Sequence, residues 1–283
     1  MLTKNYLAIY AKSFNWAGFF LPKKTYDKCS ALYDFCRVAD NIADDENKIE
    51  VKKNNFTKFR NNFINKNYDD PVIKNMWDII NEFNISTKIV DDLFQGINSD
   101  IKDSVKLYSK KEILIYSYRV AGTVGLMMAK ILNVSKEQSL KSAIDLGIAM
   151  QLTNISRDVI EDKKNNRSYI DESFEDIETT IKLSEKFYEN SFYSIKEIPL
   201  SFRFSILVAR RIYRKIGYKI LNKKNLENYK KSGKIYVSNI EKIIETLLSI
   251  FDLIKLSLIS KNDDNIEHDH DLINEEINLN ERI

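Results

Sequence analysis

Two pairs of aspartates with the same spacing are the residues of this chain best suited to chemistry. Asp40 and Asp44 form the first pair, and Asp158 and Asp162 form the second. Four residues is close to one turn of an α-helix, so each pair presents two carboxylates on one helix face. Both pairs lie among apolar residues, where an acid is costly to bury unless it is paired or binds a metal ion. The spacing alone leaves two interpretations open, a shared metal site and two solvated helix faces.

Two kinds of metal chemistry use four carboxylates on facing helices. A di-iron or di-manganese bundle uses inward glutamates and Glu-x-x-His motifs, and no histidine precedes His268 in this chain. The other kind is Mg²⁺-assisted diphosphate chemistry, because Mg²⁺ prefers oxygen ligands and is commonly held by one or two carboxylates together with substrate phosphates. Two facing aspartate pairs could then hold a metal cluster that neutralises a diphosphate leaving group.

The composition argues against several classes of protein. The chain has 283 residues with 44 Lys and Arg against 41 Asp and Glu, and a net charge of +3 is not that of a dedicated nucleic-acid-binding protein. No signal peptide is expected, since Lys12 and Asn15 interrupt the first apolar run, and no run of about 18 apolar residues predicts a membrane span. Cys29 and Cys36 are interpreted as packing residues in a reducing cytosol.

Helical periodicity dominates the chain, and strand-like alternation is scarce. Only 7 Gly and 3 Pro interrupt it, and 43% apolar residues suffice for a sizeable core. These features predict a single all-α domain, a helical bundle, over residues 1–260. The expected helices are 3–18, 24–44, 50–66, 71–83, 86–99, 109–132, 136–162, 176–192, 200–222 and 235–260.

The last residues, 261–283, form an acidic tail that carries both histidines, His268 and His270. A His-Asp-His sequence could bind a metal ion. A solvated, frayed or disordered terminal segment is the favoured interpretation, because the tail is strongly charged and lies at the end of the chain.

Further segments flank the aspartate pairs in a fixed order. They are KSFNWAGFFLP, ALYDFCRVADNIADD, SYRVAGTVGLMMAKIL, DLGIAMQLTNISRDVIEDKKNNRSYI, and ARRIYRKIGYKI followed by GKIYVSNIEKI. Together with the aspartates, these segments resemble the squalene/phytoene synthase family. The second and fourth are similar to its two aspartate-rich helices, and the third is similar to a helix typical of its phytoene synthase branch. The resemblance covers about residues 10–250, is weak over 46–90, and does not include the tail.

The resemblance implies an isoprenoid synthase type bundle around a central cavity. It also implies a prenyltransferase that binds two allylic diphosphates with Mg²⁺ or Mn²⁺, ionises one of them, and joins them head-to-head through a cyclopropylcarbinyl diphosphate. We favour a phytoene synthase, which uses two geranylgeranyl diphosphates. One alternative is a C30 synthase that uses farnesyl diphosphate. The other is a non-catalytic assembly factor of the family, but such proteins typically lack the metal-binding acids, and all four are present in this chain. No NADPH is expected, since the chain has no Gly-rich dinucleotide fingerprint.

The resemblance assigns roles to individual residues as well. The four aspartates would ligate metal ions, and Arg37 and Arg157 would bind diphosphate oxygens with their forked donors, or form salt bridges to the adjacent acids. Tyr33 and Tyr213 would contact phosphate or the carbocation, with ordinary core tyrosines as the alternative. The further substrate-binding residues are Ser13, Phe14, Gln151, Asn154, Arg167, Lys234 and Lys242. For the amide of Gln151 a purely structural, buried role is the alternative.

Three small residues, Ala121, Gly122 and Gly125, lie within one expected helix, where glycine lowers helix stability. Close helix packing explains them, and the resemblance adds that they would leave room for a prenyl tail. Because prenyl diphosphates and their products are apolar, we expect a cytoplasmic protein that associates peripherally with a membrane. A carotenoid desaturase is the expected downstream partner, and no nucleic acid is expected to bind.

Overall fold

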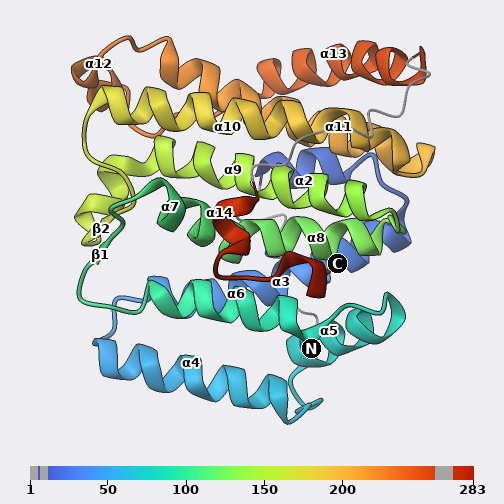
Figure 1. Ribbon diagram of the computed structural model, residues 1–283, viewed down its shortest axis with the longest axis vertical. Helices are drawn as coiled ribbons and strands as arrows, with labels where there is room; N and C mark the ends of the chain where they lie inside the picture. The colour runs from blue at the N-terminus through green and yellow to red at the C-terminus, as the bar shows by residue number, and fades with distance from the viewer. Residues whose placement is uncertain (1–5, 7–11, 259–269) are drawn as a thin grey trace.

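The computed structural model describes Tyr6, residues 12–258 and residues 270–283 of the chain. These residues form a bundle of helices with one pair of two-residue strands, which confirms the predicted all-α fold (Figure 1). The elements are α2 (Lys12–Gly18), α3 (Lys23–Asp44), α4 (Ile49–Ile64), α5 (Pro71–Glu82), α6 (Thr87–Ser99), β1 (Val105–Lys106), α7 (Lys110–Ser117), the π-helical η1 (Tyr118–Gly122), α8 (Thr123–Ile131), α9 (Glu137–Lys164), β2 (Arg167–Ser168), α10 (Phe174–Ser194), the 3₁₀ turn η2 (Ile195–Glu197), α11 (Leu200–Leu221), α12 (Leu226–Lys231), α13 (Asn239–Leu258), α14 (Asp271–Asn274) and the 3₁₀ turn η3 (Leu279–Glu281).

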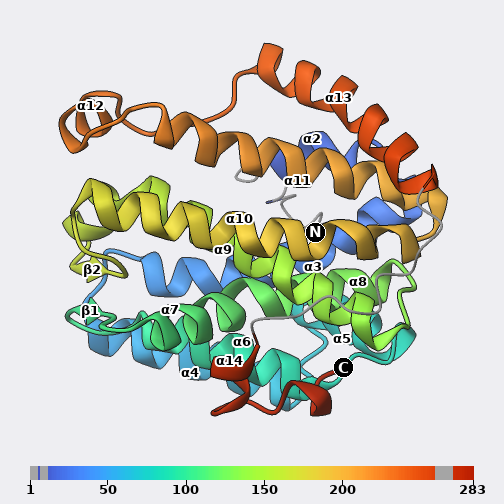
Figure 2. The same ribbon diagram turned by 45° about the horizontal axis from the view of Figure 1, so that its top comes forward.

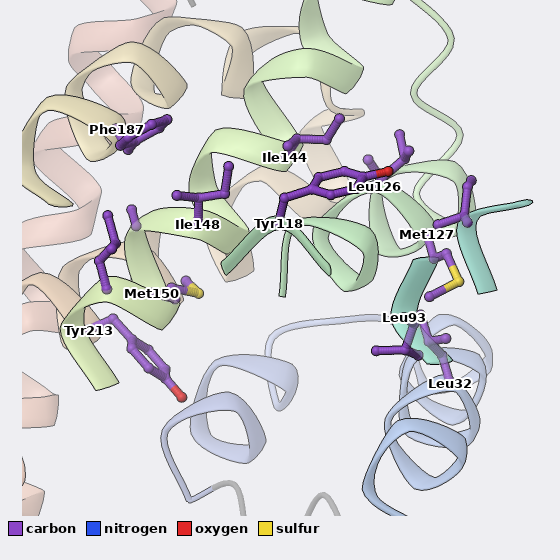
Figure 3. Packing of buried hydrophobic residues seen from close by; sticks show 14 of the residues in the cluster. Leu32, Leu93, Tyr118, Leu126, Met127, Ile144, Ile148, Met150, Phe187 and Tyr213 are labelled. Atoms are coloured by element: carbon purple, nitrogen blue, oxygen red, sulfur yellow. The ribbon is translucent and has the colours of Figure 1, made fainter. Parts of the chain in front are cut away.

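The helices lie side by side, with α12 and α13 at one end of the bundle and α4 and α5 at the other (Figures 1 and 2). Helix α9 is central and packs against α8, α10, α11 and η1. Its residues Ile144 and Ile148 are fully buried, together with Tyr118 of η1 and Phe187 of α10 (Figure 3). This placement explains why α9 is apolar for much of its length, since neighbours surround it on most sides.

Several helices begin where a side chain can accept a hydrogen bond from a free backbone N–H. Such N-caps satisfy donors that have no partner inside the helix. Pro71 follows one of them, at the position where its missing N–H is tolerated. The capping residues are Asp70, Ser86, Ser109, Ser173 and Asn225. The observed starts after the first four of these caps agree with the expected starts to within two residues, whereas a helix after Asn225 was not expected.

The expected helix 109–132 is wrong in one respect, because it is divided into α7, η1 and α8. A π turn inserts an extra residue into the helix, which apolar spacing alone does not indicate. Gly96 of α6 lies against this turn, where an added Cβ would come within 2.8 Å of Arg119 Cβ. The short helix α12 and the parallel pairing of Val105 with Arg167 were also not predicted from the sequence.

Helix α9 crosses η1 and α8 at two glycines. A Cβ on Gly125 would lie 2.3 Å from the carbonyl oxygen of Ala143, and a Cβ on Gly147 would lie 2.3 Å from that of Ala121. Backbone therefore touches backbone at this crossing, as the interpretation of close packing requires. Gly122 is packed against Tyr118.

Replacing Gly147 with alanine is expected to lower the free energy of unfolding by about 2 kcal/mol, because a methyl group at the crossing must push two helix backbones apart. Gly217→Ala in α11 is the matched control. Its added Cβ would lie 3.4 Å from Ile181, so the better helix propensity of alanine should leave stability unchanged or raise it by up to about 1 kcal/mol. Urea denaturation of both variants measures the difference, and equal effects would contradict the backbone contact.

The expectation of a frayed tail is wrong for residues 270–283, which fold back onto the bundle as α14 and η3 near α7 (Figure 2). One buried and one partly buried polar contact hold the segment. His270 Nε2 lies 2.6 Å from Asp145 Oδ1, and Arg282 donates to both oxygens of Asp92 at 2.9 and 3.1 Å. His270 therefore has a partner inside the bundle. His268 lies outside the described residues.

None of the described helices is long and apolar enough to cross a lipid bilayer.

Candidate active site

A cavity of about 1100 Å³ lies inside the bundle, with α2, α3, α8, α9 and α11 among its walls. This volume is at the upper end of the range for ligand pockets. Along α9 the lining changes from small and apolar residues, such as Ala143 and Leu146, to the polar Asn154 and Asp158. The cavity therefore has a polar part and an apolar part.

The first aspartate pair lines the polar part from α3. Arg37 Nη1 donates to Asp40 Oδ2 at 2.5 Å and lies 3.8 Å from Asp44. Arg167, from β2, donates to Asp44 Oδ1 at 2.7 Å and to the carbonyl oxygen of Ala43 at 3.1 Å. The strand pair therefore brings an arginine from a distant part of the sequence to the end of α3.

The second pair lines the same cavity from the last turns of α9. Arg157 donates to both oxygens of Asp158, with its Nε 2.8 Å from Oδ1. Lys234 Nζ lies 3.6 Å from Asp158 Oδ1 and 2.6 Å from Glu161 Oε2. Asp162, one turn further along α9, also lines the cavity. Each aspartate pair is therefore accompanied by at least two cationic side chains.

Burial and mutual repulsion raise the pKa of one acid in each pair. Burial, with the charge of Asp44 as the next cause, raises the pKa of Asp40 to about 6. Burial, followed by the charge of Asp158, raises the pKa of Asp162 to about 7. An acid that is crowded in this way gains stabilisation when a cation is placed beside it.

The donor set fits a hard divalent cation, which prefers oxygen ligands. Four carboxylates line one cavity, and the buried Oδ1 of Asn154 has no hydrogen-bond partner among the described residues. Within the same ranges, no three Asp, Glu, His or Cys side chains lie close enough together to hold an ion by themselves. Besides carboxylates, phosphate oxygens and water are the ligands that Mg²⁺ commonly takes.

Aromatic side chains form the wall next to the polar part of the cavity. The rings of Phe14 and Tyr213 are 4.9 Å apart between centroids, and both line the cavity with Tyr33. Burial raises the pKa of Tyr213 to about 12 and that of Tyr33 further, so both phenols are neutral near pH 7. Asn154 Nδ2 donates to Gln151 Oε1 at 3.4 Å, which places the two predicted amides side by side.

Two predicted site residues do not line the cavity. Ser13 is a half-buried residue of α2, and Lys242 is a buried residue of α13 whose ammonium lies 5.9 Å from the ring of Trp16. The other predicted site residues all line it. Ala121 and Gly125 line it as well, and Gly122 does not.

A hydrogen-bonded group in the cavity wall was missed by the sequence analysis. Asp100 accepts hydrogen bonds from the hydroxyls of Tyr116 and Tyr169, both at 2.8 Å, and these two hydroxyls are 2.9 Å apart. Tyr169 follows Arg167 by two residues, so the group fixes the strand that carries this arginine. The sequence gives no signal for Asp100, a single acid at the end of α6.

Both cysteines are free thiols that line the cavity, and burial raises the pKa of each to about 12. At pH 8 the thiolate fraction is then only about 10⁻⁴. We expect Cys29 and Cys36 to react with Ellman's reagent far more slowly in the folded protein than in urea, and faster as the pH rises. Rapid labelling of both thiols in the native protein at pH 8 would contradict the raised pKa values of Cys29 and Cys36.

A sequence profile described as squalene/phytoene synthase matches residues 7–241. The chain belongs to the squalene/phytoene synthase family. Members of this family are prenyltransferases that act on prenyl diphosphates and generally depend on divalent metal ions.

Named relatives within the squalene/phytoene synthase family include bacterial phytoene synthases. The chain is 27% identical to the 15-cis-phytoene synthase of Pantoea ananas over 248 residues, covering 76% of this chain and 80% of that protein. It is 29% identical to the phytoene synthase of Cereibacter sphaeroides over 242 residues, covering 74% of this chain and 68% of that protein. These matches confirm the predicted family and the resemblance to bacterial phytoene synthases.

Solved structures confirm the isoprenoid synthase type fold of this family member. A dehydrosqualene synthase crystallised with a ligand has a TM-score of 0.72 and 26% identity, covering 88% of this chain and 94% of that chain. The squalene synthase HpnC from Alicyclobacillus acidocaldarius has a TM-score of 0.65 at 15% identity, covering 78% and 90% of the two chains, which supports the fold alone.

Proposed function

We propose that this protein is a phytoene synthase, which condenses two geranylgeranyl diphosphates head-to-head to phytoene and releases diphosphate. The observation that carries the proposal is the cavity of about 1100 Å³, with two aspartate pairs in its polar part and small and apolar residues in the rest of its wall. A diphosphate fits the polar part, and long prenyl tails fit the apolar part. The resemblance to named phytoene synthases over about three quarters of the chain supports the C20 substrate.

We also propose that the metal ion is Mg²⁺, with Mn²⁺ as a substitute. The four aspartates would hold it together with substrate phosphate oxygens, and the Asn154 side chain is placed to bind water or phosphate. When bound, such ions neutralise the charge of the leaving diphosphate.

Three cationic side chains, Arg37, Arg157 and Lys234, line the same part of the cavity and bring positive charge to the leaving group. Their ion pairs with the aspartates hold them in place before substrate binds. Phe14 and Tyr213 offer ring faces that attract a carbocation.

A C30 synthase that uses farnesyl diphosphate is the second candidate. It is favoured by one observation, the close structural similarity to a dehydrosqualene synthase. The two candidates differ in the length of the prenyl tail and share the leaving group, so the polar part of the cavity cannot separate them.

Incubation of the purified protein with Mg²⁺ and either the C15 or the C20 diphosphate tests the proposal. We expect a C40 hydrocarbon of the mass of phytoene from the C20 substrate, without added NADPH. Release of a C30 hydrocarbon from the C15 substrate and no product from the C20 substrate would replace the phytoene assignment with the C30 one.

We further propose that the protein is cytoplasmic and associates peripherally with a membrane. The substrate carries long apolar tails and the product is a hydrocarbon, so both partition into lipid. The product is a substrate for oxidative desaturation, and a carotenoid desaturase is the proposed enzyme that consumes it.

A further inference from the structure

Helix α13 is oriented with its polar side toward the protein. Glu245 and Asp252 accept hydrogen bonds from Arg211 of α11 at 3.2 and 2.6 Å. Lys242 is 6% exposed and Glu245 is 7% exposed. A surface helix of a globular protein normally turns its charged side to solvent and its apolar side to the core. In α13 this relation is reversed.

The outward face of α13 is apolar as a consequence. Between residues 243 and 254, every exposed side chain of the helix is a large hydrophobe. Phe251 is 67% exposed and Leu247 is 56% exposed. We call this surface the α13 face, which consists of Ile240, Ile243, Ile244, Leu247, Leu248, Ile250, Phe251, Ile254 and Leu258. Contiguous exposed apolar surface of this kind marks an interaction site.

We propose that the α13 face docks onto the surface of an anionic lipid bilayer, with the helix lying in the plane of the interface. The proposal rests on the proposed function, because a lipid-soluble substrate and product need exchange with a lipid phase. It extends that function by assigning the surface that makes the contact. An amphipathic helix with an apolar face can bury that face at the boundary between headgroups and acyl chains without spanning the bilayer.

The segment that leads into α13 has the charge that an anionic membrane attracts. Residues 222–233 contain four lysines and one glutamate. The short helix α12 in this segment lies at the same end of the molecule as α13 in both views (Figures 1 and 2). Lysines near the surface of an anionic leaflet contribute attraction that adds to the burial of an apolar face. This combination favours a bilayer over an uncharged apolar partner.

The position of α13 also connects the face to the cavity. Helix α13 packs on α11, and Trp16 of α2 donates to Thr246 of α13 at 3.0 Å. The cavity is lined from α2 by Ala17 and from α11 by Ile206. One layer of helices, α2 and α11, therefore separates α13 from the cavity. A bilayer on the α13 face would lie on the same side of the cavity as these two helices, with α13 between the lipid and that layer.

Flotation of the full-length protein with vesicles tests the proposal. The vesicles contain phosphatidylcholine with about one third phosphatidylglycerol, and pure phosphatidylcholine vesicles serve for comparison. We expect the wild-type protein to float with the anionic vesicles and less with the neutral ones. Leu247→Glu/Phe251→Glu should reduce the bound fraction by at least about tenfold, because two charges replace side chains that enter the lipid. The single variant Phe251→Ser is measured alongside as a milder change.

Ile64→Glu is the matched control, because Ile64 is 53% exposed on α4 at the opposite end of the bundle (Figure 1). It should bind vesicles like the wild type, and all variants should keep their melting temperature. Turnover of detergent-dispersed substrate is recorded separately, so that vesicle binding without turnover counts against the proposed function and not against this surface. Three results would overturn the proposal. The wild type could fail to float with vesicles, or the Phe251 variants could bind vesicles as well as the wild type does. The third is a wild-type dimer that dissociates in these variants, with no vesicle binding by the wild type.

Discussion

Replacing Asp158 with asparagine is expected to lower kcat on prenyl diphosphates by at least about 10²-fold at saturating Mg²⁺. The Asp158 side chain is only 16% exposed, and Arg157 and Lys234 both face its oxygens. Asparagine keeps the size of the side chain and removes its charge, so a metal ion loses an anionic ligand in a partly buried site. The concentration of Mg²⁺ at half-maximal turnover should therefore rise as well, which a purely structural role would not cause.

Glu161→Gln provides the control for this prediction. Glu161 lies on the same helix and binds the same lysine, with Lys234 Nζ 2.6 Å away, but its side chain is 57% exposed. Loss of such an exposed ion pair should change turnover by no more than about twofold. Circular dichroism of both variants verifies that they fold. Wild-type turnover and an unchanged Mg²⁺ requirement in Asp158→Asn would remove the second aspartate pair from the metal site.

The two aspartate pairs could be predicted from the sequence because each lies within a single helix. Spacing inside a helix fixes which side chains share a face, whatever the rest of the fold does. The same local logic places Arg37 beside Asp40, and it predicted helix 24–44 to within one residue of α3. Arg167 was predicted as a substrate-binding residue only from the family resemblance, because β1 and β2 are too short to leave a strand pattern in the sequence.

Contacts between distant parts of the chain account for what the sequence did not indicate. Lys242 was placed near substrate, but α13 turns it toward Trp16 of α2. Whether a polar residue faces inward or outward depends on the helix it packs against. Here Arg211 of α11 binds Glu245 and Asp252, and this sets the side of α13 that faces the protein. The tail was interpreted as frayed from its charge and its terminal position. Its packing on the bundle was not indicated, because its partners are remote, with Arg282 and Asp92 separated by 190 residues.

The C-terminal segment is the feature with the largest expected effect on stability. Arg282→Ala should lower the free energy of unfolding by about 3 kcal/mol, because Asp92, with a side chain only 2% exposed, would lose its bidentate partner and stay buried as a charge. The hydroxyl of Tyr118 still donates to Asp92 at 2.9 Å and compensates only in part. Thermal and urea denaturation of the full-length protein measure the loss.

Two further variants separate the buried charge from the loss of surface contacts. Lys88→Ala removes the neighbouring pair with Glu281, whose side chains are 55% and 49% exposed, and should change stability by no more than about 0.5 kcal/mol. Adding Asp92→Asn to Arg282→Ala removes the unpaired charge, so the double variant should be more stable than Arg282→Ala alone. If the double variant were the less stable one, the cost of Arg282→Ala would come from lost packing of η3 and not from Asp92. The segment would then stabilise the bundle mainly through its apolar residues, of which Ile273 and Leu279 are almost fully buried.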